Sequence, residues 1–163
     1  MAHHRQWFEQ PSDEQRQCIG LSEMRLTIQQ DTLTPELFLK LYQSVDWDAP
    51  GIDQVRVALA NSTATFTAYA ELEPVGMVRL IGDGGMSFYI KDFAVVPSMQ
   101  SQGVGAALLA ALKRHVRSLI EPGWAVSLEL ISSQDAVGFY ERHGFEPRPN
   151  DWDGPGMFTM IRA

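Results

Sequence analysis

A glycine-containing turn between an expected strand and an expected helix constrains the fold of this chain more than any other feature. The strand is expected over 86–96, Pro97 follows it, and the turn runs from Gln100 to Gly105. Over 103–120, apolar residues recur at spacings of three and four, which predicts an amphipathic helix. These residues are Val104, Ala107, Leu108, Ala111, Leu112, Val116 and Leu119. Such a turn leaves backbone amides unpaired at the positive end of a helix dipole, a geometry that binds phosphate.

The two glycines of this turn, Gly103 and Gly105, suit a phosphate site. A side chain at either position would hold an anion away from the amides or strain a positive φ angle. No Lys-Ser or Lys-Thr pair follows them, so the turn is not the P-loop of nucleotide hydrolases. The spacing also departs from the Gly-x-Gly-x-x-Gly of dinucleotide sites. The alternative is that the glycines only make a tight connection between strand and helix.

The rest of the chain predicts a single domain in which strands and helices alternate. Thr34 and Pro35 begin the first helix, since Thr caps free amides and Pro suits a first turn. The strand over 86–96 is expected at the centre of the sheet. Residues 1–20 predict a flexible lead-in, and the domain is expected over 21–163. Further strands are expected over 24–29, 63–71, 75–81, 124–131 and 157–161, and further helices over 55–61 and 134–143.

Composition narrows the class of protein. With 163 residues, 45% of them apolar, the chain can bury a core without disulfides. The only cysteine, Cys18, has no partner, and no apolar stretch approaches the roughly 20 residues that span a bilayer. We therefore expect a cytoplasmic protein with no membrane partner. A net charge of −7 argues against nucleic acid and mildly favours cationic substrates, although modest acidity also keeps a protein soluble.

Two segments resemble the GCN5-related N-acetyltransferase (GNAT) superfamily. The run Val95–Leu109, which contains Gln100-Ser101-Gln102-Gly103-Val104-Gly105, is similar to its acetyl-CoA motif, Gln/Arg-x-x-Gly-x-Gly/Ala. The run Ala136–Phe145 resembles its second motif, and the resemblance extends over residues 63–146. It implies an α/β (α+β) domain with a mixed, mostly antiparallel, splayed central sheet flanked by helices.

The resemblance also implies an acetyl-CoA site. The amides from Gln102 to Ala106 would hold the CoA pyrophosphate, and the pantetheine arm would follow the edge of the strand near Phe93, as an added strand does. Ser133 stands where many relatives have an asparagine that contacts the arm. The full expected set is Phe93, Ala94, Val95, Gln100, Ser101, Gln102, Gly103, Val104, Gly105, Ala106, Ser133 and Phe139.

Acetyl transfer from a thioester to an amine needs a stabilised oxyanion and a proton for the departing thiolate. Tyr140 falls at the family's general-acid position, and packing beside Phe139 is its alternative role. The amide of Val95 is expected to meet the oxyanion. No base is assigned, because the family's base position aligns with Tyr89 or Lys91 and neither side chain is a ready base.

Other polar residues have structural alternatives. Strict alternation along the strand places Asp92 on the face opposite Tyr89, Lys91 and Phe93. Two roles are open for Asp92: binding of the amine, or a structural pairing with a backbone group or an arginine. The segment Asp46-Trp47-Asp48 lies where this family shapes its acceptor pocket, and an aromatic ring beside acids suits an amine. His115 follows the apolar stripe of its helix, and no residue spacing indicates a metal site.

The leading hypothesis is an acetyl-CoA-dependent N-acetyltransferase of a small primary amine, with direct attack on the thioester. The alternatives are acetylation of a protein N-terminus or lysine, and a CoA-binding sensor module without catalysis. The expected partners are acetyl-CoA and the amine, with neither nucleic acid nor a membrane, and a homodimer is compatible with the chain.

Overall fold

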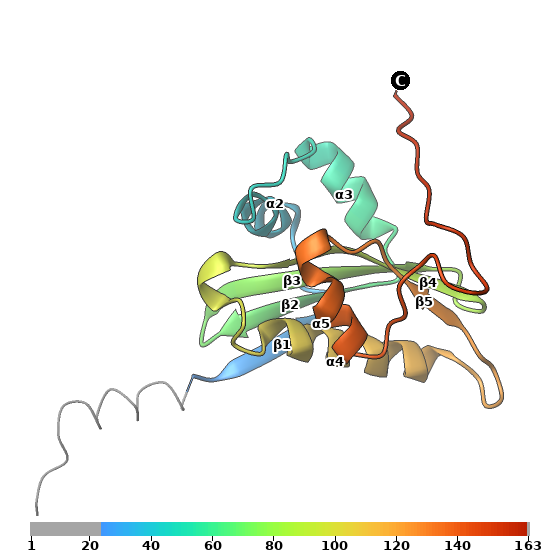
Figure 1. The fold of residues 1–163 in the computed structure, drawn as a ribbon. Helices are drawn as coiled ribbons and strands as arrows, with labels where there is room; N and C mark the ends of the chain where they lie inside the picture. Colours follow the sequence, from blue (N-terminus) through green and yellow to red (C-terminus); the bar gives the residue numbers. More distant parts are fainter. Residues whose placement is uncertain (1–23, 163) are drawn as a thin grey trace, which may run out of the picture.

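The structure is a computed structural model that describes residues 24–162, so the expected lead-in over residues 1–20 lies outside the described residues. Five strands and four α-helices follow one another in it (Figure 1). Two single turns of 3-10 helix, η1 and η2, precede α4 and α5. The elements are β1 (Leu26–Gln30), α2 (Pro35–Gln43), α3 (Ile52–Ala60), β2 (Ala64–Ala70), β3 (Glu73–Gly82), β4 (Ser87–Val95), η1 (Pro97–Met99), α4 (Val104–Leu119), β5 (Ser127–Glu129), η2 (Gln134–Ala136) and α5 (Val137–Arg142).

The five strands form one sheet in sequence order, β1-β2-β3-β4-β5. The first three pairings are antiparallel and the last, β4 with β5, is parallel. The expected mixed, mostly antiparallel sheet is therefore confirmed, but β3 is its middle strand rather than β4. The prediction of a central β4 was wrong because β5 adds only one short strand beyond it.

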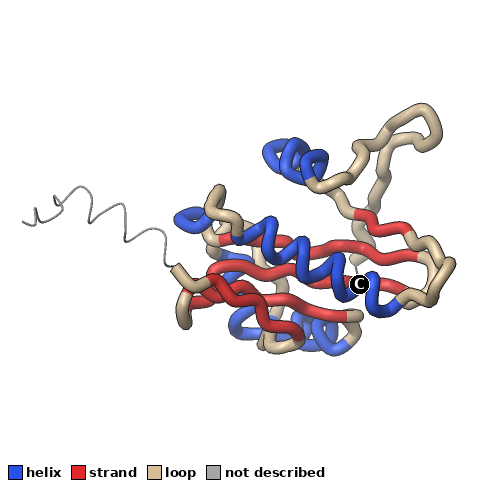
Figure 2. Tube along the Cα trace, turned by 90° about the horizontal axis from the view of Figure 1, so that it is seen from below, coloured by secondary structure: helices blue, strands red, loops and turns tan. Residues whose placement is uncertain are grey.

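Helices cover both faces of the sheet (Figures 1 and 2). On one face, α4 and α5 pack over the larger core, which includes Phe66, Phe88 and Leu108. On the other face, α2 and α3 close a smaller core around Phe38, Leu41 and other side chains. Within α2, the Thr34 hydroxyl accepts a hydrogen bond from the Leu37 amide at 3.2 Å, as the cap predicted.

The strand expected over 157–161 does not form. Met157, Phe158 and Ile161 are 82–90% exposed in an extended tail that leaves the sheet (Figure 1). The residue types favoured a strand, but these side chains stay exposed in the part of the chain that the structure describes, and β propensity produces a strand only where side chains are buried. The strand expected over 124–131 is likewise reduced to Ser127–Glu129.

Candidate active site

The turn between β4 and α4, which we call the cradle loop (Gln100–Ala106), contains two residues with positive φ. These are Ser101, at 60°, and Gly103, at 84°, which precedes the first residue of α4. No side chain among the described residues caps the helix there. None of the six amides from Ser101 to Ala106 donates a hydrogen bond to any group within residues 24–162. The loop therefore presents a row of free donors at a helix N-terminus, which fits a phosphate group.

Side chains of the cradle loop stabilise its shape. The Gln100 amide group donates to the Val95 carbonyl at 3.0 Å, and that of Gln102 donates to the Ser98 carbonyl at 2.8 Å. The two glycines differ in what they require. Gly103 has open space around it but a φ that L side chains rarely adopt, whereas a Cβ on Gly105 would lie 3.4 Å from the Phe139 ring.

Along β4, before the chain reaches the cradle loop, β4 and β5 separate. They pair only where Ser87–Tyr89 faces Ser127–Glu129, so within residues 24–162 no strand pairs with the end of β4 on that side. The Val96 amide donates to the Val75 carbonyl at 2.9 Å, and the next pair along is Gly76 with Val95. Because bonded and non-bonded pairs alternate in an antiparallel ladder, the Val95 amide points away from β3, into the gap.

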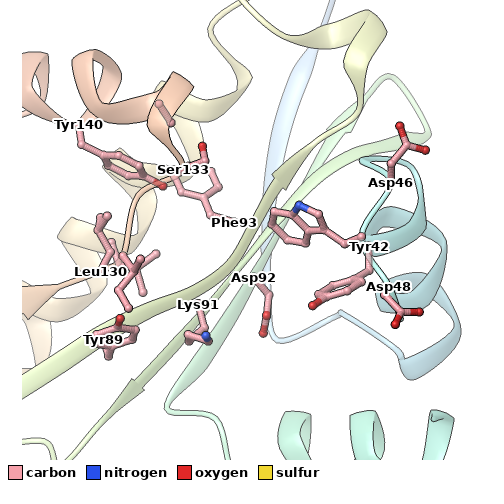
Figure 3. A pocket seen from close by; sticks show the side chains of 14 residues that line it. Tyr42, Asp46, Asp48, Tyr89, Lys91, Asp92, Phe93, Leu130, Ser133 and Tyr140 are labelled. Atoms are coloured by element: carbon pink, nitrogen blue, oxygen red, sulfur yellow. The ribbon is translucent and has the colours of Figure 1, made fainter. Parts of the chain in front are cut away.

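A cleft of about 540 Å³ opens beside this gap (Figure 3). Tyr140, Ser133 and Leu130 lie on one side of it, and Tyr42, Asp46 and Asp48 lie on the other, with β4 between them. A volume of this size is typical of small-molecule sites. The cleft is lined by Tyr42, Asp46, Trp47, Asp48, Tyr89, Ile90, Lys91, Asp92, Phe93, Leu130, Ile131, Ser133, Ala136 and Tyr140.

Tyr140 lies on α5 within a group of aromatic rings. Its ring centre is 6.1 Å from that of Phe93, 5.1 Å from that of Phe139 and 5.6 Å from that of Phe145. Burial raises the pKa of the Tyr140 phenol to about 12. The side chain therefore both packs and faces the cleft, so the two roles expected for it are compatible, and its hydroxyl stays protonated at ordinary pH.

Asp92 does not follow the alternation expected from the sequence. The strand is bulged there, with Lys91 opposite Arg79 and Ala94 opposite Met77, and Asp92 has a φ of 51°. The extra residue places Asp92 on the same face as Lys91, because both lie beside Arg79. Its Oδ2 is 2.7 Å from the Arg79 Nε, so the expected arginine pairing is present.

The side of the cleft opposite Tyr140 comes from α2 and its connection to α3. Tyr42 stacks on Phe38 and meets the Trp47 ring edge-on, with ring centres 5.2 and 4.9 Å apart. Burial, together with the negative charges of Asp92 and Asp48, raises the pKa of the Tyr42 phenol. Sequence reasoning indicated Asp46, Trp47 and Asp48 but missed Tyr42, whose spacing four residues from Phe38 was the available signal.

Other expected residues lie apart from this chemistry. His115 is on α4, against Phe66 at a ring distance of 5.7 Å, on the opposite face of the sheet from Asp92. Within residues 24–162, no three His, Cys, Asp or Glu side chains are grouped as metal ligands. In the same part of the chain, no helix has both the length and the apolar character needed to cross a membrane.

A family model described as an acetyltransferase (GNAT) domain matches residues 42–153. The chain belongs to the GNAT family. The match spans more than half of the sequence and includes the cradle loop, Tyr140 and the cleft residue Tyr42 of α2. This GNAT protein is thus an N-acetyltransferase by family, and its splayed sheet is the family's fold.

Relatives and a solved structure agree with this assignment. An uncharacterized N-acetyltransferase of Pyropia yezoensis is 29% identical over 128 residues, which cover 76% of this chain and 70% of that protein. The chloroplastic GCN5-related N-acetyltransferase 1 of Arabidopsis thaliana is 29% identical over 153 residues, which cover 93% of this chain and 73% of that protein. The structure of a GNAT family acetyltransferase from Streptococcus pneumoniae superposes with a TM-score of 0.70 at 31% identity. The superposition covers 85% of this chain and 100% of that one.

Proposed function

We propose that this GNAT protein transfers the acetyl group of acetyl-CoA to a primary amine of a small molecule. The observation that carries the proposal is the arrangement along β4. Free amides of the cradle loop follow its end, the Val95 amide points into the gap, and Tyr140 faces the same cleft. The phosphate would bind the cradle-loop amides, the thioester would lie at the Val95 amide, and the amine would enter the cleft.

The residues divide the work of direct transfer. Bound acetyl-CoA would supply a thioester carbon open to attack by a neutral amine. The Val95 amide would donate a hydrogen bond to the acyl oxygen as that oxygen becomes negative. The nitrogen gains a bond to the acyl carbon, the carbon–sulfur bond breaks, and the proton count balances because nitrogen loses one proton and sulfur gains one.

Tyr140 would serve the departing sulfur. With its pKa at about 12, its hydroxyl is protonated throughout the range in which an alkyl amine becomes neutral. That value is higher than the roughly 8.5 of a thiol, so full proton transfer from Tyr140 to sulfur is uphill by itself. We infer that Tyr140 first donates a hydrogen bond to the sulfur, and that the proton lost by nitrogen completes the exchange.

The acceptor side of the cleft supports a small, cationic amine. Trp47 is 40% exposed beside Tyr42, and the carboxylates of Asp46 and Asp48 lie in the same wall. An aromatic face and nearby negative charge both attract an ammonium group. Lys91 is the cation in the lining, so the wall is negative overall.

The function can be tested by thiol release from acetyl-CoA with a panel of small primary amines and peptides, beside heat-unfolding scans with acetyl-CoA alone. We expect acetyl-CoA to raise the unfolding temperature and some small amine to release thiol. Stabilisation by acetyl-CoA without thiol release from any amine would instead favour a CoA-binding sensor. Turnover confined to peptides would favour a protein acetyltransferase.

Replacing Tyr140 by Phe tests its role. We expect kcat to fall about 100-fold, as when one hydrogen bond to developing negative charge is lost, while the Kd for acetyl-CoA stays the same. In the wild type, kcat should not fall between about pH 8 and 10, since a raised pKa keeps the phenol protonated there. Tyr69→Phe, on β2 and outside the cleft lining, is the control. A Tyr140→Phe variant with wild-type kcat would contradict the assignment.

A further inference from the structure

The bulge in β4 is tied to a neighbouring strand by one ion pair. Arg79 of β3 donates from its Nε to the Asp92 Oδ2 at 2.7 Å, and both side chains are 13% exposed. The Arg79 Nη1 also donates to the Ser62 hydroxyl at 3.3 Å. That hydroxyl in turn donates to the Ala58 carbonyl at 2.8 Å, near the end of α3. The bulge is therefore anchored both to β3 and to α3.

The anchor lies where the backbone most needs support. Asp92 has a φ of 51°, a left-handed conformation that side chains other than Asn, Asp and Gly rarely adopt. Such residues remain in place only when their surroundings fix them. A partly buried ion pair to the side chain of the bulged residue itself fixes it directly.

The bulge determines which face each later residue of β4 occupies. Ile90 belongs to the core under α4, and with strict alternation Phe93 would take the opposite face. The extra residue shifts the phase by one. Phe93 therefore packs under α5, 6.0 Å from Phe139 and 6.1 Å from Tyr140 between ring centres, while Ala94 joins the core under α2. The same shift sets the register in which the Val95 amide points into the gap.

We propose that Arg79 and Asp92 are positioning residues that hold the β4 bulge and so aim Phe93 and the Val95 amide at the reacting thioester. This inference rests on the proposed function. It gives Asp92 a role other than base, because one carboxylate oxygen is engaged by Arg79 and the backbone needs an Asp-like residue there. The cradle loop lies beyond the bulge and is formed by its own hydrogen bonds.

The test compares three substitutions at Asp92. Asn keeps the left-handed preference and a side-chain oxygen for Arg79, Gly keeps only the backbone freedom, and Ala keeps neither. We expect Asp92→Ala and Arg79→Ala to lower kcat at least tenfold, since misplacement of about 1 Å is enough for that. Their Kd for acetyl-CoA, measured by calorimetry, should change less than about threefold. Asp92→Asn should retain most of the kcat, and Asp92→Gly should fall between Asn and Ala.

Opposite outcomes identify what has failed. If Asp92→Asn loses as much kcat as Asp92→Ala, the carboxylate charge acts in the chemistry and the positioning role is wrong. If kcat and acetyl-CoA affinity fall together in every variant, the pair is merely structural. Arg56→Ala removes the exposed pair with Asp53 on α3 and is the matched control. If the wild type itself turns over no amine, the proposed function is wrong, and the positioning role that rests on it is wrong as well.

Discussion

Two glycine-containing turns flank β4, and they treat their backbone amides in opposite ways. In the turn before it, the Asp83 Oδ1 accepts hydrogen bonds from the amides of Gly85, Met86 and Ser87 at 2.8–3.0 Å. In the cradle loop after it, no carboxylate is present and the amides from Ser101 to Ala106 stay free within the described chain. One turn carries its own anion, and the other is left open for an anion from outside.

The comparison separates turns that stabilise a fold from turns that serve a ligand. The three bonds from amides lower the pKa of Asp83 to about 2, which shows how strongly such donors favour negative charge. The cradle loop has more donors, and it also has the positive end of the α4 dipole. Its unused capacity is the physical reason to expect a phosphate there.

A carboxylate placed in the cradle loop should remove the difference between the two turns. Ser101 already has a positive φ, which Asp and Asn tolerate, so Ser101→Asp and Ser101→Asn both suit the backbone. We expect Ser101→Asp to weaken acetyl-CoA binding about 100-fold, because like charges brought together cost several kcal/mol. The unfolding temperature should stay the same or rise, since a negative charge at a helix N-terminus is stabilising.

Ser101→Asn is the matched control, as it has the same shape without the charge. Its Kd, measured by calorimetry beside that of Ser101→Asp, should stay within a few-fold of the wild type. Equal loss in both variants would mean that shape, not charge, explains the effect. Unchanged affinity in Ser101→Asp would remove the phosphate from the cradle loop altogether.

A smaller effect is expected from backbone strain alone. Gly103→Ala adds one methyl group in open space but forces a φ of 84° on a residue with a Cβ. That conformation costs about 1–2 kcal/mol, so a loop that relaxes to avoid it should lose roughly tenfold in acetyl-CoA affinity. Gly123→Ala is the control, because Gly123 has a φ of 86° and is equally open but lies at the far end of α4. Both variants should lose stability, and only Gly103→Ala should lose affinity.

Residues that act through the main chain could be predicted from sequence. Two glycines, the apolar period of α4 and the strand before it were enough to locate the cradle loop, whereas the expected role of the Val95 amide came from the resemblance to the GNAT family. Such features depend on local conformation, which nearby residues dictate. The same holds for the cap at Thr34 and for the helix that carries Tyr140.

Features that depend on contacts between distant residues could not be predicted. The β4 bulge needs Arg79, thirteen residues before Asp92, and nothing in the local pattern of β4 indicates it. The tail over 157–161 has strand-like residues, but whether a strand forms depends on a neighbour for it to pair with. Tyr42 lines the cleft only because α2 crosses that end of the sheet.

The smallest effect is expected in the turn that already holds its own anion. The pKa of Asp83 is lower in the folded chain than its ordinary 3.8, so its ionised form stabilises the fold above about pH 4. That stabilisation is lost as the pH falls toward 2. Asp83→Asn keeps an oxygen but no charge, so the gap in unfolding temperature between wild type and variant should be widest near pH 7 and close by about pH 2. Melts followed by circular dichroism would measure it, with Asp53→Asn, which removes an exposed carboxylate of α3, as the control. A gap at Asp83 that does not depend on pH would mean that the hydrogen bonds, and not the charge, hold this turn, and the contrast with the cradle loop would then rest on geometry alone.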